Sequence, residues 1–405
     1  MSKLDEILLL TNGPGELSTW VPPVLSRLRN AVPEARIELF LIRDQFAAGT
    51  ETAKAKELAL DGVSGRAGMF TRMAQRKSAK RGVVLMLGGA PRDAVGLGKS
   101  TGYPAFSYSF DPKAWYPGLK AFLVDSERTR VKAVARGAEQ ARVHVVGNLV
   151  VDALEEGDRG SGSSARCWSG VGGREGVDVL LFPSSRPFAA RYLLGFMLAA
   201  AETMAKTNPG LRFAWVKSGL LSDAVIEEAV SGRWAREIGG VGAKWDGQEL
   251  VSENGLMIAV LDESQRYAAM RQAKVALTIP GTNTLELALA GLPSVILLPL
   301  HKPELIPLEG FWHWLFMFPG GKYLKQSFVR RLEPTVSHLA LPNLWLNERV
   351  FPELRGVFGP EQVAQAALDL LRPQRQAEVK AKLKGLGATP GADNLVRYVL
   401  ENVNR

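Results

Sequence analysis

Short apolar runs alternate with stretches of helical spacing along most of this chain, and this alternation limits the folds open to it. In the first half, strand-like runs at residues 7–10, 37–42 and 83–87 are each followed by a helical pattern. Two parallel strands need a connection of about a dozen residues or more, and a helix supplies it. The order therefore predicts an α/β fold, a parallel sheet with helices on both faces.

The pattern stops once and then starts again. Residues 157–176 include Ser161-Gly-Ser-Ser164 and Gly170-Val-Gly-Gly173, a composition typical of a linker, and strand-like runs resume at residues 177–182. We therefore expect two Rossmann-like, doubly wound domains. The expected organisation is an N-terminal acceptor-binding domain (1–156), a linker (157–176), a C-terminal nucleotide-sugar-binding domain (177–372) and a helical segment that packs back on the first domain (373–405). Between Asp223 and Asn254 we expect two short helices at most.

Composition excludes several classes of protein. The 405 residues are 46% hydrophobic and 22% charged, as in a globular protein of two domains. The single cysteine, Cys167, rules out a disulfide framework, and the four histidines lack ligand spacing, so we expect no metal and no cofactor. No run reaches the roughly 20 apolar residues that span a bilayer, and the N-terminus is unlike a signal peptide, so we expect a cytoplasmic protein.

The net charge of +9 favours an anionic partner. No nucleic-acid-binding motif accompanies the cations, so we expect a nucleotide or a membrane surface and no nucleic acid. Residues 65–82 combine cations with Met69, Phe70 and Met73, and an apolar, aromatic run at residues 309–322 precedes further cations. Both suit the headgroup region of an anionic membrane. A helix that packs those three residues into the core, and an apolar loop buried between domains, are the alternatives.

The segment from Thr278 to Leu298 predicts a phosphate-binding turn. A buried strand ends at Ile279, Gly281 to Asn283 form a turn of small residues, and a helix and a second strand follow. The free N–H groups at a helix start bind phosphate oxygens well. Glu286, one turn into the helix, could cap those groups or reach a sugar hydroxyl. An ordinary strand-to-helix turn with a capped helix is the alternative.

A second glycine turn follows the first strand. Gly13 and Gly15, with Pro14 between them, allow the backbone to come close to a ligand, and Glu16 and Ser18 lie at the rim of the turn. The spacing is not that of a dinucleotide fingerprint. Because ligands of doubly wound sheets bind at the carboxyl ends of the strands, we expect four polar residues to share one edge. They are Glu16, Ser18, Asp93 and Asp111.

Eight segments, in their order and spacing, resemble one known family. They are Gly15-Glu-Leu-Ser18, Tyr108-Ser-Phe-Asp-Pro-Lys-Ala-Trp115, Val145-Val-Gly-Asn-Leu-Val-Val-Asp152, Leu181-Phe-Pro-Ser-Ser-Arg186, Pro280-Gly-Thr-Asn-Thr-Leu-Glu286, Leu341-Pro-Asn-Leu344, Pro352-Glu353 and Gly387-Ala-Thr-Pro-Gly-Ala392. Together they resemble the lipid-A-disaccharide synthase family over nearly the whole chain. The resemblance implies the GT-B glycosyltransferase architecture, in which two Rossmann-like domains face each other across a cleft.

The resemblance also implies an activity. We expect an inverting glycosyltransferase that moves a sugar of the N-acetylglucosamine type from UDP to a lipid or membrane-linked acceptor, as a peripheral protein on the inner face of the cytoplasmic membrane. Glu16 is the first candidate for the general base and Asp93 the second. The acceptor side would include Gly13, Gly15, Ser18 and Asp111. The donor side would include Ser184, Ser185, Arg186, Gly281, Thr282, Asn283, Thr284, Glu286, Asn343 and Glu353.

Two departures from the family pattern leave the base and the acceptor open. The family usually continues Gly-Glu-x-Ser with Gly-Asp, where this chain has Thr19-Trp20, and usually carries an aspartate before Ala-Pro, where this chain has Gly88-Gly89. A divergent branch is therefore expected. A UDP-N-acetylglucosamine 2-epimerase-like isomerase and a non-catalytic nucleotide-sugar or lipid-binding protein are the alternatives, and the sequence leaves the oligomeric state open.

Overall fold

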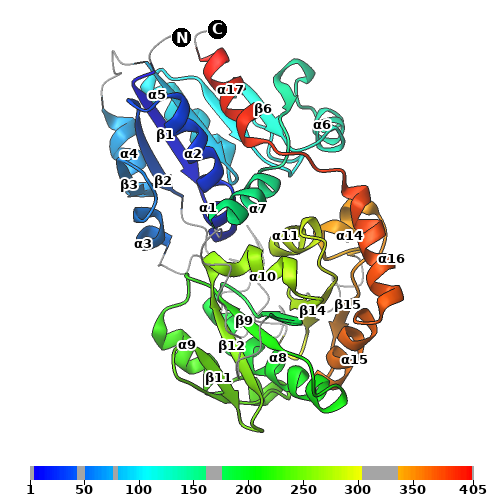
Figure 1. Cartoon of the computed structure of the whole chain (residues 1–405). Coiled ribbons are helices and arrows are strands. Elements are labelled where there is room, and N and C mark those ends of the chain that lie inside the picture. The colour runs from blue at the N-terminus through cyan, green and yellow to red at the C-terminus, as the bar shows by residue number, and fades with distance from the viewer. Residues whose placement is uncertain (1–3, 43–50, 76–80, 161–175, 303–335, 404–405) are drawn as a thin grey trace, which may run out of the picture. The chain divides into compact units, whose positions relative to one another are not determined.

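The computed structural model of the chain describes residues 4–42, 51–75, 81–160, 176–302 and 336–403 (Figure 1). The chain forms two compact units: unit 1 consists of residues 1–156 and 388–405, and unit 2 of residues 157–387. Helix α7 (Leu149–Gly160) continues through the first four residues of the stretch expected to be a linker. The rest of that stretch, residues 161–175 with Cys167, lies outside the described residues.

Unit 1 is built on a parallel sheet with the strand order β3-β2-β1-β4-β5-β6-β7. Its strands are β1 (Glu6–Thr11), β2 (Arg36–Leu41), β3 (Gly62–Gly65), β4 (Gly82–Leu87), β5 (Ala105–Tyr108), β6 (Ala121–Val124) and β7 (Val143–Val145). The β1 strand pairs with both β2 and β4, and every residue of β1 and β4 is buried, as expected for central strands covered on both faces. The order reverses between β1 and β4, which makes their carboxyl ends the switch point where such sheets bind ligands.

The helices of unit 1 connect these strands. They are α1 (Pro14–Thr19), α2 (Val21–Ala31), α3 (Glu51–Lys56), α4 (Arg66–Ala74), α5 (Pro91–Thr101), α6 (Glu127–Val134), η1 (Gln140–Arg142), α7 and the C-terminal α17 (Ala392–Asn402). Figure 1 shows α17, in red, beside the blue and cyan elements of the N-terminal part, and it packs against α2. The chain thus returns to unit 1 after completing unit 2.

Two of the family-like segments meet where α17 joins unit 1. The buried carboxylate of Asp152 accepts hydrogen bonds from the N–H groups of Gly391 (2.6 Å) and Ala392 (3.0 Å), at the start of α17. The N–H of Asn148 donates to the carbonyl of Thr389 at 2.8 Å. Gly147 has a φ of +112°, and a Cβ there would lie 2.3 Å from the carbonyl oxygen of residue 390. A role in docking the last helix therefore explains the residue types in both segments.

Unit 2 has an eight-stranded sheet with the order β10-β11-β12-β9-β8-β13-β14-β15. Its strands are β8 (Val179–Phe182), β9 (Phe213–Lys217), β10 (Ala243–Trp245), β11 (Glu249–Ser252), β12 (Met257–Asp262), β13 (Val275–Thr278), β14 (Ser294–Pro299) and β15 (Glu353–Gly356). The six strands from β12 to β15 are parallel, and β10 and β11 extend the sheet as an antiparallel hairpin. Between Asp223 and Asn254 the structure has two short helices, as expected, but also the two strands of this hairpin, which were not predicted.

The core of unit 2 surrounds the 21-residue helix α8 (Pro187–Thr207). The other helices are α9 (Asp223–Val230), η3 (Ala235–Ile238), η4 (Glu263–Gln265), α10 (Arg266–Gln272), α11 (Asn283–Leu289), α14 (Leu341–Leu346), α15 (Pro360–Leu370), α16 (Pro373–Leu383) and η7 (Lys384–Leu386). The order reverses between β8 and β13, the switch point of this unit. Of the expected C-terminal segment 373–405, α16 belongs to unit 2 and α17 to unit 1.

Candidate functional site

The switch point of unit 2 brings together two of the predicted donor segments. Phe182, the last residue of β8, pairs with Thr278, the last residue of β13, so residues 183–186 and 279–284 leave the sheet side by side. Helix α8 begins directly after the first of them, with Arg186 as its N-cap residue. The positive end of a 21-residue helix dipole therefore lies at this edge, which favours an anionic group.

The two segments are shaped by short-range hydrogen bonds. The N–H of Arg186 donates to Ser184 Oγ at 2.9 Å, and Ser184, Ser185 and Arg186 are all half-buried. Thr284 Oγ1 donates to the carbonyl of Gly281 at 2.8 Å, and it accepts a hydrogen bond from the N–H of Leu341 at 3.1 Å. These bonds fix the curvature of the turn and tie it to the start of α14.

The turn itself is open. Gly281 is exposed and has a φ of +153°, and nothing lies within 4 Å of the place where a Cβ would be. Thr282 and Asn283 are half-buried, and Asn283 Nδ2 donates to Thr278 Oγ1 at 3.1 Å. An approaching ligand can therefore reach the backbone of this turn at Gly281.

Glu286 lies in a buried ion pair. One of its carboxylate oxygens is 3.3 Å from Nε of Arg266 in α10, and Arg266 also contacts Glu263 and the hydroxyl of Tyr267. Burial alone would lower the pKa of Arg266. The carboxylate of Glu286, the hydroxyl of Tyr267 and the carboxylate of Glu263 outweigh burial and raise this pKa, so the guanidinium stays charged. Glu286 thus neutralises a buried cation, and a sugar hydroxyl would have to share its carboxylate.

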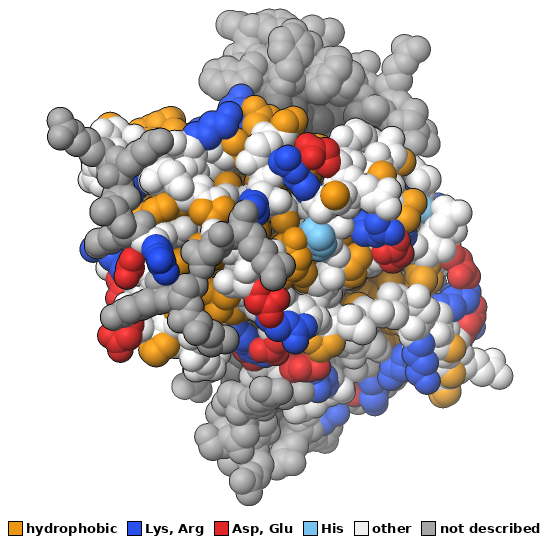
Figure 2. Space-filling model, turned by 90° about the horizontal axis from the view of Figure 1, so that it is seen from above, with side chains coloured by type: hydrophobic (Ala, Val, Ile, Leu, Met, Phe, Trp, Pro, Cys, Tyr) orange, Lys and Arg blue, Asp and Glu red, His pale blue; other side chains and the backbone are white. Residues whose placement is uncertain are grey.

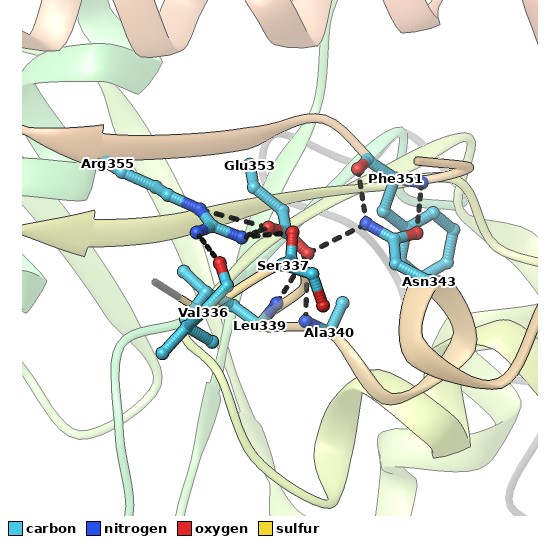
Figure 3. Close-up of polar contacts among 8 residues, drawn as sticks. All are labelled: Val336, Ser337, Leu339, Ala340, Asn343, Phe351, Glu353 and Arg355. Carbon is cyan, nitrogen blue, oxygen red and sulfur yellow. Dashed lines mark hydrogen bonds and ion pairs between the residues drawn. The ribbon is translucent and has the colours of Figure 1, made fainter. Parts of the chain in front are cut away.

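Glu353 and its neighbours form a dense polar network (Figure 3). The side chain of Glu353 is 0% exposed, and it accepts hydrogen bonds from the N–H groups of Leu339 (2.9 Å) and Ala340 (3.0 Å) and from Asn343 Nδ2 (2.8 Å). The guanidinium of Arg355 binds the same carboxylate. Burial favours the neutral acid, but the backbone N–H of Ala340 and the Arg355 guanidinium outweigh it and lower the pKa of Glu353.

Asn343 completes this network. Its amide nitrogen also donates to the carbonyl of Phe351, and its amide oxygen accepts a hydrogen bond from the N–H of Phe351, both at 2.8 Å. Asn343 and Glu353 therefore hold the start of α14 against β15. Because the N–H of Leu341, at that start, donates a hydrogen bond to Thr284 Oγ1, this network supports the turn at residues 280–284 from behind and gives Asn343 and Glu353 a positioning role.

The switch point of unit 1 is occupied by a glycine pair beneath Glu16. Gly88 and Gly89 follow β4 with φ angles of +76° and +88°. A Cβ on Gly88 would lie 2.7 Å from Glu16 Cγ, and a Cβ on Gly13 would lie 2.0 Å from Glu16 Oε2. The side chain of Glu16 therefore folds back over Gly13 and Gly88, at the carboxyl ends of β1 and β4.

Trp20 lies against the same glycine. Its Cζ3 would be 3.0 Å from a Cβ on Gly88, and its ring packs edge-on against Tyr108 (centroids 5.2 Å apart) and Phe110 (5.0 Å). Only 2% of Trp20 is exposed. The two departures of this chain from the family pattern, at residues 19–20 and 88–89, are therefore in contact, because the tryptophan ring takes up space beside the glycine.

The other predicted residues of unit 1 have different surroundings. Asp93, in the first turn of α5, is 3.3 Å from the guanidinium of Arg66, and Ser18 Oγ accepts a hydrogen bond from Lys54 Nζ at 2.8 Å. Asp111 is exposed and caps a turn, since one of its carboxylate oxygens accepts the N–H of residue 113 at 2.9 Å. Gly15 is half-buried inside α1. Of the two candidate bases, only Glu16 covers the switch point.

The two segments expected to lie at a membrane surface are only partly described. In α4, Met69 is buried, Met73 is half-buried and Phe70 is 55% exposed. Residues 76–80 and the aromatic run at 309–322, with the cations that follow it, lie outside the described residues. On the face seen in Figure 2, basic and acidic side chains are interspersed with apolar ones. No helix in the described part of the chain combines the length and apolarity needed to cross a bilayer.

Within residues 4–42, 51–75, 81–160, 176–302 and 336–403, no three His, Cys, Asp or Glu side chains are grouped so as to hold a metal ion.

The family model described as lipid-A-disaccharide synthetase matches residues 243–302, a span that includes β13, the turn at residues 280–284 and α11. Curated lipid-A-disaccharide synthases also match. The protein from Syntrophus aciditrophicus is 26% identical over 300 residues (71% of this chain, 65% of the relative), and that from Trichlorobacter lovleyi is 28% identical over 233 residues (55% and 49%). This chain is a divergent relative of the lipid-A-disaccharide synthase family.

The similarity to the lipid-A-disaccharide synthase family is spread unevenly. The protein from Nitrobacter hamburgensis is 33% identical, but over only 135 residues, 32% of this chain and 28% of the relative. The chain thus spans from about a quarter to about two thirds of the length of the curated relatives it matches.

Solved structures match nearly the whole chain. UDP-N-acetylglucosamine 2-epimerase from Rickettsia bellii has a TM-score of 0.57 at 12% identity and covers 99% of this chain and 97% of its own. The S. aureus MnaA structure with UDP has a TM-score of 0.54 at 11% identity (99% and 98%), and Acinetobacter baumannii MurG has 0.51 at 13% (98% and 99%). At such low identity these matches concern the fold. The predicted fold class, α/β with two Rossmann-like, doubly wound domains of the GT-B type, is confirmed.

Sequence reasoning missed three residues that shape these sites. Arg266, the partner of Glu286, lies in a helix with no motif of its own. Trp20 had been noted only as a departure from the lipid-A-disaccharide synthase family, although an aromatic residue beside a glycine turn signals close packing. Asn12 stands between β1 and the Gly-Pro-Gly turn, at the carboxyl end of a central strand, which is where ligands of such sheets bind. The ligand-binding roles of the predicted residues stay predictions.

Proposed function

We propose that this protein is an inverting glycosyltransferase that moves a sugar of the N-acetylglucosamine type from a UDP-sugar to a lipid or membrane-linked acceptor. One observation carries the proposal: the span shared with the lipid-A-disaccharide synthase family contains the turn at residues 280–284, which lies at the switch point of the sheet of unit 2. Both the family relationship and the position of this open turn favour a bound diphosphate.

Unit 2 supplies the donor site in this proposal. Backbone N–H groups at the turn and at the start of α8 bind the diphosphate oxygens, and the guanidinium of Arg186 adds a positive charge. When the bond between the sugar and the diphosphate breaks, UDP gains negative charge. Donors that already point at the phosphates stabilise this charge without reorganising, which lowers the barrier. Glu353 and Asn343 keep the turn in place from behind.

Unit 1 supplies the acceptor side. The carboxylate of Glu16 takes the proton of an acceptor hydroxyl while the oxygen attacks the anomeric carbon, and UDP leaves from the opposite side, so the anomeric configuration inverts. Asp93 is the weaker candidate because its carboxylate is engaged by Arg66. An acceptor in a membrane fits the net charge of +9 and the exposed Phe70, and it would make this a peripheral protein of the inner face of the cytoplasmic membrane.

Binding of the donor can be tested first. Thermal unfolding with a panel of UDP-sugars should show an increase in Tm that grows with the logarithm of the ligand concentration. UDP release is then measured with a detergent-solubilised bacterial lipid extract as acceptor. Glu16→Gln should lower turnover by about two to four orders of magnitude, as expected for loss of a general base, with unchanged UDP-sugar binding.

Three outcomes would count against the proposal. The first is a protein that no UDP-sugar stabilises, and the second is a Glu16→Gln variant with wild-type turnover. The third is conversion of UDP-N-acetylglucosamine into an isomer without any acceptor, which would favour an epimerase, the activity named for several solved proteins that share this fold.

A further inference from the structure

Asn12 has a buried polar group without a partner. It follows β1 directly, and its side-chain amide oxygen is shielded from solvent and accepts no hydrogen bond from any described residue. Leaving a buried acceptor unpaired costs about 1–3 kcal/mol, so native proteins rarely retain one without a reason. The neighbouring Thr11 shows the usual arrangement, since its hydroxyl donates to the carbonyl of Leu87 at 2.9 Å.

The side chain that carries this unpaired oxygen lies close to Glu16, the proposed catalytic base. A Cβ on Gly89 would lie 2.8 Å from Asn12 Cγ, while a Cβ on the preceding Gly88 would lie 2.7 Å from Glu16 Cγ. Asn12 and Glu16 therefore stand over adjacent residues of the same glycine pair. Both glycines have a positive φ, and any larger residue at either position would collide with one of the two polar side chains.

We propose that Asn12 is an acceptor-positioning residue, whose amide oxygen accepts a hydrogen bond from a second hydroxyl or an amide N–H of the substrate that Glu16 deprotonates. This inference rests on the proposed function. It also narrows the acceptor chemically. A sugar headgroup carries several donors close together and can use Asn12 and Glu16 at once, whereas a simple alcohol can use only one of them. The pair therefore favours an acceptor whose reacting hydroxyl has a second hydrogen-bond donor beside it, as a sugar has.

The test separates a positioning role from a structural one. Asn12→Leu keeps the approximate shape and removes the unpaired oxygen, so the Tm should stay constant or rise. The KM for a detergent-solubilised bacterial glycolipid extract should increase, or kcat/KM should decrease, by at least about tenfold, the loss expected for a hydrogen bond of about 1.4 kcal/mol. The Kd for UDP-N-acetylglucosamine should not change. Asn30→Leu, at an exposed asparagine of α2, is the matched control.

Each other outcome overturns the inference in a recognisable way. Wild-type kinetics in Asn12→Leu would refute the role of Asn12 and leave the glycosyltransferase proposal intact. If Asn12→Leu lowers the Tm by several degrees and reduces donor binding and transfer equally, the role of Asn12 is structural. In that case Asn12→Asp, which keeps an acceptor oxygen, should fail to restore the wild-type KM. A wild-type protein that neither binds UDP-N-acetylglucosamine nor releases UDP would overturn both proposals together.

Discussion

Replacement of Gly88 by alanine tests the coupling between the glycine pair, Glu16 and Trp20. The backbone at Gly88 has a φ of +76°, and a side chain in this region costs about 1–2 kcal/mol. The added methyl group would also lie 2.7 Å from Glu16 Cγ and 3.0 Å from the Trp20 ring, and overpacking of this kind costs about 1–3 kcal/mol. Gly88→Ala should therefore destabilise unit 1 by about 2–5 kcal/mol.

Gly137→Ala is the matched control. Gly137 also belongs to unit 1 and has a φ of +97°, but nothing lies within 4 Å of its Cβ position. The control should therefore show only the backbone cost, about 1–2 kcal/mol. Calorimetric unfolding of the whole chain measures both, because about 1 kcal/mol lowers the Tm of a unit of this size by about 2–4 °C. Activity should also fall in Gly88→Ala, since Glu16 must move.

A double-mutant cycle then tests the role of the tryptophan. Trp20→Ala should itself be costly, about 3–5 kcal/mol, because a buried aromatic ring is lost. In that background, however, Gly88→Ala should cost about 1–2 kcal/mol less than in the wild type, because one of its two collisions is gone. Equal destabilisation by Gly88→Ala and Gly137→Ala, or the same cost with and without Trp20, would refute the packing argument.

Three further predictions concern charged groups that stabilise each unit internally. Asp178 is 4% exposed and pairs with Arg212, and hydrogen bonds from Arg212 and from a neighbouring lysine outweigh its burial and lower its pKa to about 2. Asp178→Asn should therefore lower the free energy of unfolding by about 2 kcal/mol near pH 7. This difference should shrink as the pH falls from about 4 towards 2. Glu353→Ala should destabilise unit 2 by about 3–5 kcal/mol, leaving Arg355 buried without its carboxylate, and weaken UDP-sugar binding in calorimetric titrations. Asp152→Ala should uncap α17 at a cost of about 1–2 kcal/mol, measurable as faster amide hydrogen exchange in that helix.

These predictions have clear contrary results. A pH-independent difference between wild type and Asp178→Asn would show that the carboxylate is not ionised against Arg212 in the folded state. Full UDP-sugar affinity in Glu353→Ala would show that the network does not support the turn. Unchanged exchange rates throughout α17 in Asp152→Ala would show that the helix start is held by other contacts.

The sequence predicted the layout of the sheets because buried parallel strands leave a local signal. Continuous apolar runs such as residues 7–10 belong to strands buried on both faces, and small residues mark the turns that follow them. The hairpin β10–β11 was missed because its strands are short and depend on pairing with β12. The Asp246-Gly247 dipeptide between them is a hairpin signal that could have revealed it.

The candidate site could be predicted only in part for a similar reason. Glu16 and the turn at residues 280–284 are recognisable because they follow strands directly. The surroundings of Glu286 and Glu353 were not, because Arg266 reaches Glu286 from another helix, and Asn343 and the N–H groups of residues 339 and 340 reach Glu353 from another segment, through tertiary contacts that leave no sequence pattern. A carboxylate in a family-like segment can bind a ligand or neutralise a buried cation, and only the position of the cation distinguishes the two.

The missing acid of this chain has a structural explanation that the sequence comparison alone could not provide. Glu16 and Trp20 already fill the space above Gly88, so a residue with a side chain there would meet both. An aspartate directly before Ala90 would replace Gly89, where a Cβ would lie 2.7 Å from Met86 Cε and 2.8 Å from Asn12 Cγ, so neither glycine of the pair can be replaced unless a neighbouring side chain moves. The departures at residues 19–20 and 88–89 are in contact through Trp20 and Gly88, and Glu16 is the carboxylate that lies over this switch point.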